Sequence, residues 1–373
     1  MTPTIIDINC LIVDIPTIRP HKMSVATMGS QSMVIVRIKS SDDVEGIGEA
    51  TTIAGLNYGG ESPESIKTNI DTYFRPLLLG QPANQVAALR RLIAKNIKDN
   101  RFAKSAIETA LYDARARRLG VSISDLFGGR VHDSIPVAWT LASGDTRIDV
   151  DEALRMLELR RHNVFKLKIG RREPKEDLRY IESIRKAVGD DISLRVDLNQ
   201  GWSETQAVRY LQPLADVGVE LVEQPIHFKN LAGMARLTAL GRVPIMADES
   251  LQGPQDGFVL ASQHCANVFA IKIEQAGGLQ AARDLIAIAE AADIALYGGT
   301  MLEGSVATIA AAHLFSTLSH LEWGSEMFGP LLLTDDILVT PLDYSDFSLK
   351  LPTGPGLGIA LDEDKLGFYA RKH

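Results

Sequence analysis

Three acidic residues recur at nearly equal intervals along this chain. Asp197, Glu223 and Asp248 lie about 25 residues apart, and each directly follows a short, strand-like apolar run. An interval of that length fits one strand followed by one helix, so consecutive strands would each carry one carboxylate to the same edge of a sheet. Carboxylate oxygens are the ligands that Mg²⁺ and Mn²⁺ prefer, and they suit zinc poorly. The spacing therefore predicts a divalent metal site with these three residues as ligands.

Lysines lie one interval before and one interval after the three acids. Lys166 and Lys168 are two residues apart in a strand-like run, so they share one face, and Lys272 ends the run that follows Asp248. A dication beside lysines suits one kind of chemistry: the metal stabilises the enediolate of a carboxylate while a lysine moves the α-proton. A second nearby positive charge favours loss of a proton near neutral pH. We interpret Lys168 as the general acid/base, Lys166 as the neighbour that tunes it and binds a carboxylate, and Lys272 as the group on the opposite face of the substrate.

The charges of this set favour an anionic substrate. Three carboxylates, three lysines and one dication sum to a positive charge, and the sign survives when Glu326 is included, so a small dicarboxylate fits best. Asn199 and Glu249 lie beside two of the acids in the sequence, and they are predicted to interact with the metal ligands without binding the metal themselves. Other candidates are interpreted as structural or exposed because they lack partner spacing; they are His21, His162, His227, His264, His313, His320, Cys10 and Cys265. Gly298-Gly299-Thr300 is interpreted as a tight barrel turn.

The elements that must position these residues alternate between strands and helices. Eight strand-like runs follow one another at 135–141, 164–169, 192–197, 219–223, 243–248, 268–273, 294–297 and 321–325, with amphipathic helices such as 175–188 and 279–292 between them. A doubly wound sheet would not aim so many strand ends at one centre, whereas a parallel barrel does. The pattern predicts an α/β fold with a modified TIM barrel, (β/α)7β, over residues 131–326.

The first 130 residues predict an α+β capping domain. Strands are expected at 5–14, 33–39 and 45–49, and helices at 65–74, 86–97 and 103–118. The segment 327–373 is too irregular to extend the barrel, so we expect it to return to the cap and complete it. Two segments, 17–31 and 51–62, are predicted to be loops, and the second has the glycines and isolated apolar residues of a lid over a site.

Composition excludes several classes of protein. The net charge of −8 and the lack of a basic block argue against a nucleic-acid partner. No apolar run reaches membrane-spanning length, and no signal peptide is visible at the N-terminus. Two cysteines far apart in the sequence fit a reducing compartment, so we expect a cytoplasmic protein.

The ordered set K-x-K, D-x-N, E-Q-P, A-D-E-S and K resembles the enolase superfamily in its muconate-lactonizing-enzyme subgroup, over essentially the whole chain. Within the subgroup the similarity is greatest to the muconate cycloisomerases, in the segments 16–22, 49–53, 138–145, 161–166, 297–301 and 328–330. The resemblance implies an isomerase of catechol degradation in the β-ketoadipate pathway. It would convert cis,cis-muconate reversibly to muconolactone through an enediolate that Lys168 protonates.

The same resemblance assigns roles to individual residues. It implies Mn²⁺ or Mg²⁺ on Asp197, Glu223 and Asp248, with Lys166, Lys168 and Lys272 as the catalytic lysines. It also implies that Glu326 is the acidic residue at the last strand. Three further residues, Ile53, Tyr58 and Phe328, would close over the substrate. The family is typically a homo-octamer.

Other interpretations are open at this point. A chloromuconate cycloisomerase would share nearly all of these residues. A dipeptide epimerase or N-acylamino-acid racemase would also use Lys168 and Lys272 on opposite faces, although dipeptide epimerases commonly have Asp-x-Asp at the last strand where this chain has Glu326-Met327-Phe328. A protein of another class, a non-catalytic barrel that binds a metal and a carboxylate, is also an alternative. Such a protein would not need a titrating lysine on each face of the ligand, so the lysines argue against it. A metal-independent enzyme acting on sugar phosphates would place three carboxylates beside the phosphate. Without a metal, these negative charges would repel it.

Overall fold

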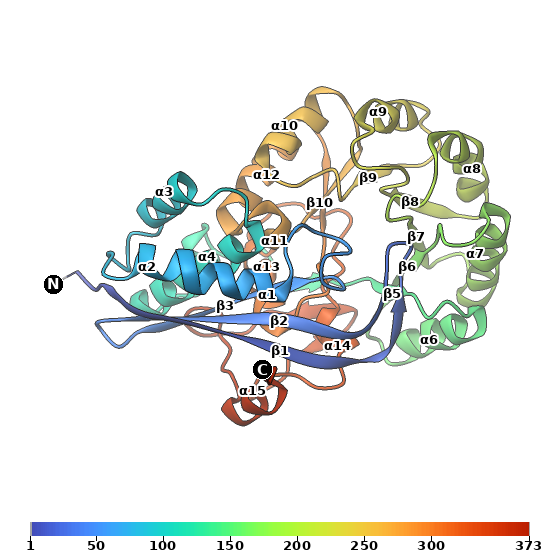
Figure 1. The fold of residues 1–373 in the computed structure, drawn as a ribbon. Coiled ribbons are helices and arrows are strands. Elements are labelled where there is room, and N and C mark those ends of the chain that lie inside the picture. Colours follow the sequence, from blue (N-terminus) through green and yellow to red (C-terminus); the bar gives the residue numbers. More distant parts are fainter. Residues whose placement is uncertain (1, 373) are drawn as a thin grey trace.

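A parallel sheet of seven strands forms the centre of the computed structural model, which describes residues 2–372 (Figure 1). The strands are hydrogen-bonded in sequence order, and nearly all their residues are buried, as expected for a parallel sheet covered on both faces. They are β5 (Trp139–Leu141), β6 (Val164–Lys168), β7 (Ser193–Asp197), β8 (Val219–Glu223), β9 (Ile245–Ala247), β10 (Val268–Ile271) and β11 (Ala295–Gly298).

Helices cover the outside of this sheet and connect its strands (Figure 1). Several begin at residues that commonly cap helices: Asp145 accepts hydrogen bonds from the first backbone N–H groups of α6, and Ser203 forms a capping box at the start of α8. The helices are α6 (Thr146–Glu158), α7 (Pro174–Val188), α8 (Glu204–Asp216), α9 (Leu231–Ala239), α10 (Pro254–Ser262), α11 (Ile273–Ala276), α12 (Leu279–Ala291) and α13 (Ser305–Phe315).

The eighth predicted strand, at 321–325, is not a regular strand. Ser325 instead forms one isolated parallel bridge with Val137 and another with Gly298, so this segment lies between the two edges of the sheet. Gly324 has a positive φ of 61°, which interrupts an extended conformation directly before the bridge. The predicted α/β barrel is confirmed, and its last strand is reduced to these two bridges.

The cap begins with an antiparallel sheet of β1 (Ile5–Lys22), β2 (Thr27–Ser40) and β3 (Glu45–Thr52). Helix α4 packs directly on β3, and a Cβ atom at Gly48 would lie 2.0 Å from the carbonyl oxygen of Ala106, so only glycine permits this approach. The helices of this region are α1 (Pro63–Asn69), the π-helical turn η1 (Ile70–Phe74), α2 (Arg75–Leu78), α3 (Val86–Asn96), α4 (Arg101–Leu119) and α5 (Ile123–Leu126).

The predicted loop at 17–31 is wrong for most of its length. β1 continues to Lys22 and β2 starts at Thr27, so the segment is a long β-hairpin that extends from the cap to the barrel (Figure 1). β1 is an edge strand with a register shift between Pro16 and His21, which is where a sheet tolerates proline. The prolines and polar residues had indicated a loop, whereas pairing with β2 keeps the chain extended.

The last part of the chain contacts both other regions. β13 pairs with β4, while Ala370 forms a bridge with Val13 and the Arg371 guanidinium donates to Asp14 at 2.7 Å. The remaining elements are α14 (Gly329–Leu332), β4 (Ser134–Pro136), β12 (Tyr344–Ser345), β13 (Ser348–Lys350) and α15 (Glu363–Tyr369). These contacts agree with a segment that returns to the cap, although the exact division at residues 130 and 326 stays a prediction.

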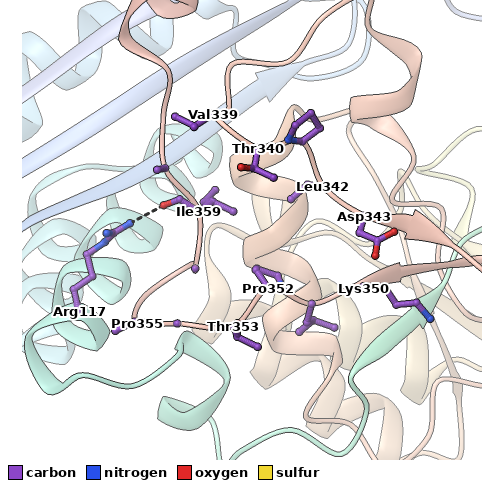
Figure 2. A pocket seen from close by; sticks show the side chains of 15 residues that line it. Arg117, Val339, Thr340, Leu342, Asp343, Lys350, Pro352, Thr353, Pro355 and Ile359 are labelled. Carbon is purple, nitrogen blue, oxygen red and sulfur yellow. Dashed lines mark hydrogen bonds between the residues drawn. The ribbon is translucent and has the colours of Figure 1, made fainter.

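A surface cavity of about 620 Å³ lies between the C-terminal segment and Arg117 of α4 (Figure 2). The Arg117 side chain donates to the carbonyl oxygen of Ile359 at 3.3 Å, which joins the two walls of this cavity. None of the predicted site residues lines it. Within residues 2–372, no helix has the length and apolar character needed to cross a membrane.

Candidate active site

The C-terminal ends of the barrel strands bring the predicted acids and lysines together. Asp197 and Glu223 are the last residues of β7 and β8 and are paired in register, and Lys168, which ends β6, is paired with Asp197. Asp248 and Lys272 directly follow β9 and β10. Because parallel strands all end at one rim, side chains far apart in sequence line a single cavity there.

The cavity is small and its wall is mostly polar. Its volume is about 10 Å³, because the lysine and acid side chains converge on one another. The cap contributes Ile53 and Tyr58, as predicted for a lid, and Lys166, Asn199 and Glu326 complete the set of predicted residues that line it. A cavity of this size has no room for a small dicarboxylate in this arrangement of side chains.

Two predicted site residues do not line this cavity. Glu249 faces a neighbouring cavity, and its carboxylate accepts a hydrogen bond from the Asn199 amide at 3.2 Å. Phe328 lies behind the wall, where its ring centroid is 5.0 Å from Trp139 and 6.3 Å from His21. In this structure Phe328 thus supports other residues of the wall and does not itself cover the cavity.

Each candidate metal ligand is paired with a lysine. Lys166 Nζ lies 2.9 Å from Glu223 Oε2 and forms a further ion pair with Glu326. Lys168 pairs with Asp197 and donates to Asn199 Oδ1 at 3.1 Å. Each ammonium group thus lies against at least one carboxylate in a site almost without solvent exposure, which makes these pairs strongly interacting.

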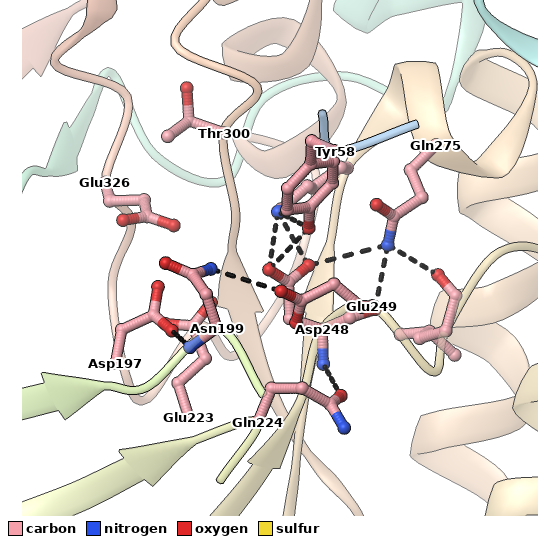
Figure 3. A network of polar contacts seen from close by, with 12 residues as sticks. Tyr58, Asp197, Asn199, Glu223, Gln224, Asp248, Glu249, Gln275, Thr300 and Glu326 are labelled. Atoms are coloured by element: carbon pink, nitrogen blue, oxygen red, sulfur yellow. Dashed lines mark hydrogen bonds and ion pairs between the residues drawn. The ribbon is translucent and has the colours of Figure 1, made fainter. Parts of the chain in front are cut away.

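A third pair lies on the opposite side of the cavity. Lys272 Nζ is 2.6 Å from Asp248 Oδ1, and it also donates to the hydroxyl of Tyr58 at 2.8 Å. The hydroxyl of Tyr58 in turn donates to Asp248 Oδ2 at 2.7 Å. Figure 3 shows Tyr58 above Asp248, with its hydroxyl directed at the carboxylate.

Burial and these charges shift the pKa values of the acids in opposite directions. Burial raises the pKa of Glu223, and the nearby Asp197 carboxylate raises it further. Asp197 is buried as well, but the ammonium groups of Lys168 and Lys166 outweigh burial and lower its pKa to about 2. Two neighbouring carboxylates that respond so differently mark a site where charges are held close together.

Two glutamines hold Asp248 in place from outside the cavity (Figure 3). Gln224 follows Glu223 and accepts hydrogen bonds from the backbone N–H groups of Asp248 and Ser250 at 3.1 and 3.2 Å. Gln275 donates to the carbonyl oxygen of Asp248 at 2.8 Å. The glutamine of the E-Q-P motif therefore connects two strand ends, a function that the sequence had not indicated.

The donor set fits a divalent cation of the Mg²⁺ or Mn²⁺ type. Glu223 Oε1 is buried and has no hydrogen-bond partner among the residues that the structure describes, and the same is true of Glu249 Oε2. Buried carboxylate oxygens without partners are costly unless a cation or a donor binds them. Within residues 2–372, no three acidic, histidine or cysteine side chains already surround a common point as a closed metal cluster, and each of the three acids contacts a lysine instead.

The structure also adds residues that the sequence had not singled out. His21, Met23, Thr140, Thr300 and Leu302 line the same cavity. His21 was predicted to be structural or exposed; it is not exposed, and it is fully buried in the cavity wall. Thr300 lies two residues after the end of β11, a position that would have marked it as a candidate, whereas Thr140 is the central residue of β5. Nothing local in the sequence indicates that a hairpin carries His21 into the barrel.

Comparison with known families agrees with this geometry. Residues 7–128 match the family model described as the mandelate racemase/muconate lactonizing enzyme N-terminal domain, and residues 149–365 match the enolase C-terminal domain-like model. Each of the two matched segments contains one part of the cavity wall: Ile53 and Tyr58 in the first, and the acids and lysines in the second.

Individual relatives are similar over their whole length. Muconate cycloisomerase 1-2 of Acinetobacter lwoffii is 57% identical over 98% of this chain and 95% of its own, and muconate cycloisomerase 1 of Pseudomonas putida is 53% identical over 100% of both. The crystal structure of muconate lactonizing enzyme from Pseudomonas fluorescens complexed with muconolactone has a TM-score of 0.98 and 53% identity, and covers 100% of both chains. The chain therefore belongs to the mandelate racemase/muconate lactonizing enzyme family of the enolase superfamily.

Proposed function

We propose that this protein is a muconate cycloisomerase, an isomerase that interconverts cis,cis-muconate and muconolactone. The observation that carries the proposal is the position of the lysines around the three acids. In the ring formed by the seven strands and the Ser325 segment, β6 with Lys166 and Lys168 lies opposite β10 with Lys272. A substrate carboxylate held at the acids would present its α-carbon between lysines on two faces, as proton transfer at that carbon requires.

The reaction forms one C–O bond and one C–H bond. An oxygen of one muconate carboxylate bonds to the near carbon of the distant double bond, and the π electrons of that bond move onto the other carboxylate, which becomes an enediolate. Lys168 then gives a proton to the carbon beside that carboxylate, which yields the methylene group of muconolactone. In the reverse direction the same lysine removes that proton.

The other residues position and stabilise the charge that develops. Asp197, Glu223 and Asp248 would hold Mn²⁺ or Mg²⁺, whose positive charge would stabilise the two negative charges of the enediolate when it is bound. Lys166 would bind the same carboxylate and favour release of the proton from Lys168, while Glu326 would hold Lys166 in place. Lys272 would stabilise negative charge on the opposite face, and Ile53 and Tyr58 would exclude water.

The wider assignment rests on the family. We propose a place in aromatic-compound catabolism, a cytoplasmic location and assembly as a homo-octamer. The two free, buried cysteines, Cys10 and Cys265, support the cytoplasmic location. The direct assay is the loss of the diene ultraviolet absorption of cis,cis-muconate with Mn²⁺. Diene absorption that persists with metal bound at the site would contradict the proposal.

A second candidate is the chlorinated substrate. Chloromuconate cycloisomerase of Pseudomonas sp. strain P51 is 48% identical over 98% of both chains, and it follows the muconate relatives in similarity. A panel with cis,cis-muconate, 2-chloromuconate and 3-chloromuconate decides between them by comparison of kcat/KM. We expect the unsubstituted substrate to have the highest value, whereas a higher value for a chlorinated one would assign the second function.

A further inference from the structure

Two residues in the wall of the site carry buried polar atoms without any partner. Both ring nitrogens of His21 and the hydroxyl of Thr140 are buried and form no hydrogen bond with any residue between 2 and 372. The other side-chain donors of this cavity are committed: the lysines to acids and the Thr300 hydroxyl to Glu303. Buried polar groups in proteins almost always have partners, so an imidazole with two free nitrogens beside a binding cavity indicates a ligand.

These two residues lie across the cavity from Asp248. Thr140 is on β5, which is opposite β9 and Asp248 in the ring of strands and the Ser325 segment. His21 is on the same side, because the backbone N–H of the following Lys22 donates to the carbonyl oxygen of Ala142, directly after β5, at 2.8 Å. A ligand that spans the cavity would therefore meet Asp248 at one end and this pair at the other.

The hairpin that carries His21 is fastened to the barrel beside it. The Arg19 guanidinium donates to Glu152 at 2.8 Å and to the carbonyl oxygen of Thr140 at 3.0 Å. The indole N–H of Trp139 donates to the same Glu152 at 2.8 Å. The strand next to His21 is thus fastened to β5 and α6, so the backbone that carries the imidazole lies in a defined position relative to Thr140.

We infer that His21 and Thr140 bind the second carboxylate of the substrate, the one that forms the new C–O bond. This inference rests on the proposed function, because it assigns the two carboxylates of one dicarboxylate to the two ends of the cavity. The N–H of an imidazole and the hydroxyl of a threonine both donate to carboxylate oxygens. Burial and the positive charges of Lys168 and Arg19 lower the pKa of His21, which agrees with a neutral ring at this position.

The polarity of the pair suits the reaction. The attacking carboxylate loses its negative charge as it becomes the lactone ester, while the charge moves to the carboxylate at the acids. A full cation beside the attacking group would stabilise the substrate more than the transition state, which slows the reaction. Neutral donors orient the carboxylate and stabilise the bound substrate less than a cation would. A histidine and a threonine therefore raise the barrier to the reaction less than a fourth lysine would.

The test compares two inert probes on the Mn²⁺-loaded enzyme. Adipate has both carboxylates of the substrate, and hexanoate has one; inhibition constants are measured for each against cis,cis-muconate, or dissociation constants by calorimetry. For the unmodified protein we expect adipate to bind more tightly. His21→Phe and Thr140→Val should each reduce the preference for adipate by about tenfold to a hundredfold, the range for a hydrogen bond to a charged group, and leave hexanoate binding unchanged.

Three variants serve as controls for folding and for chemistry. His21→Gln and Thr140→Ser keep a donor, so each should recover part of the preference for adipate. Thr109→Val removes another buried hydroxyl without a partner, in α4 and outside the cavity, and should leave both constants unchanged. Circular dichroism and melting temperatures show whether each variant folds.

Each other outcome overturns the inference. If His21→Phe and Thr140→Val weaken both probes equally, the two residues only shape the cavity. If neither probe is affected, or if the unmodified protein does not prefer adipate, no second carboxylate binds there. Failure of the proposed function is recognised separately, because it appears as intact diene absorption with cis,cis-muconate in the unmodified, metal-loaded protein, whereas the probe comparison does not depend on turnover.

Discussion

The hydroxyl of Tyr58 in the cap donates a hydrogen bond of 2.7 Å to Asp248 at the mouth of the barrel. The same hydroxyl accepts from Lys272 at 2.8 Å, so one cap residue contacts both a candidate metal ligand and a candidate catalytic lysine. Tyr58 belongs to a segment of turns between β3 and α1, with no strand or helix of its own to hold it. Its contacts therefore connect closure of the cap to the arrangement of charges in the site.

Replacing this hydroxyl should weaken catalysis without unfolding the protein. We expect Tyr58→Phe to lower kcat/KM for cis,cis-muconate by about tenfold, the typical effect of losing one hydrogen bond to a charged group. Steady-state kinetics measure this change. The matched control is Tyr73→Phe, since Tyr73 is exposed on η1 and should show unchanged kinetics. Equal kinetics for Tyr58→Phe and the unmodified protein would show that the contact has no function in the reaction.

Removing the proposed proton donor should abolish turnover. Lys168→Ala is expected to reduce kcat by a factor of about 100 to 10,000, the usual contribution of general acid/base catalysis. In heavy water the unmodified enzyme should place solvent deuterium at the new methylene carbon, which mass spectrometry detects. Lys175→Ala, at an exposed position in the first turn of α7, should behave as the unmodified protein. Product without deuterium would remove Lys168 from the proposed role.

Removal of divalent metal should affect both activity and stability. Dialysis against EDTA is expected to abolish turnover, and Mn²⁺ or Mg²⁺ should restore it. Because a cation that binds only the folded state stabilises it, metal at about 100 times its Kd should add about 2.7 kcal/mol to the free energy of unfolding. Calorimetry and melting curves with and without metal measure both effects.

A variant of one proposed ligand separates site binding from general metal effects. Glu223→Gln should weaken Mn²⁺ binding by more than about tenfold. Mutation of a residue that only hydrogen-bonds to a metal ligand already has an effect of about that size, and loss of a ligand should have a larger one. Glu220→Gln, on an exposed position of the same strand, is the control and should retain the affinity. If both variants bind Mn²⁺ as the unmodified protein does, the metal lies elsewhere.

The buried His162 should make the protein sensitive to acid. Its Nδ1 interacts with the carbonyl oxygen of Val137 at 2.8 Å, and burial lowers the pKa of His162 from 6.5 to about 4. The unfolded chain therefore takes up a proton below pH 6.5 that the folded protein does not, and stability falls as the pH drops from 6.5 to 4. The expected loss from this residue is about 3 kcal/mol over that range.

The measurement must compare variants because other groups act in the opposite direction. Burial raises the pKa of Glu49 to about 7, so that residue favours the folded protein as the pH falls through 7. Urea unfolding of the unmodified protein and of His162→Gln at pH 7.5, 6 and 5 isolates the histidine. We expect the free energy of unfolding of the variant to rise relative to that of the unmodified protein as the pH is lowered. A difference independent of pH would show that His162 is not responsible.

Much of the barrel could be predicted from the sequence because its signals are local. Each buried parallel strand is a short apolar run, and the residue that ends it lies at the same rim as its neighbours. The sequence alone therefore predicts that Asp197, Glu223 and Lys272 lie close together. The family resemblance rests on the same residues, and the full-length similarity to known muconate cycloisomerases supports it.

Other features depend on contacts between distant segments and were decided only by the tertiary structure. Pairing of β1 with β2 turns an expected loop into a hairpin, and only that hairpin carries His21 into the cavity wall. The expected last strand is reduced to two bridges at Ser325, and Phe328 lies behind Trp139 and His21 instead of over the site. The residue types and their spacing determined which chemistry the rim can perform. Strand–helix units of similar length bring each strand end, and the residue on it, to the same rim. Which other side chains reach that rim depends on how far a hairpin extends and on what packs behind it, and no local pattern encodes either.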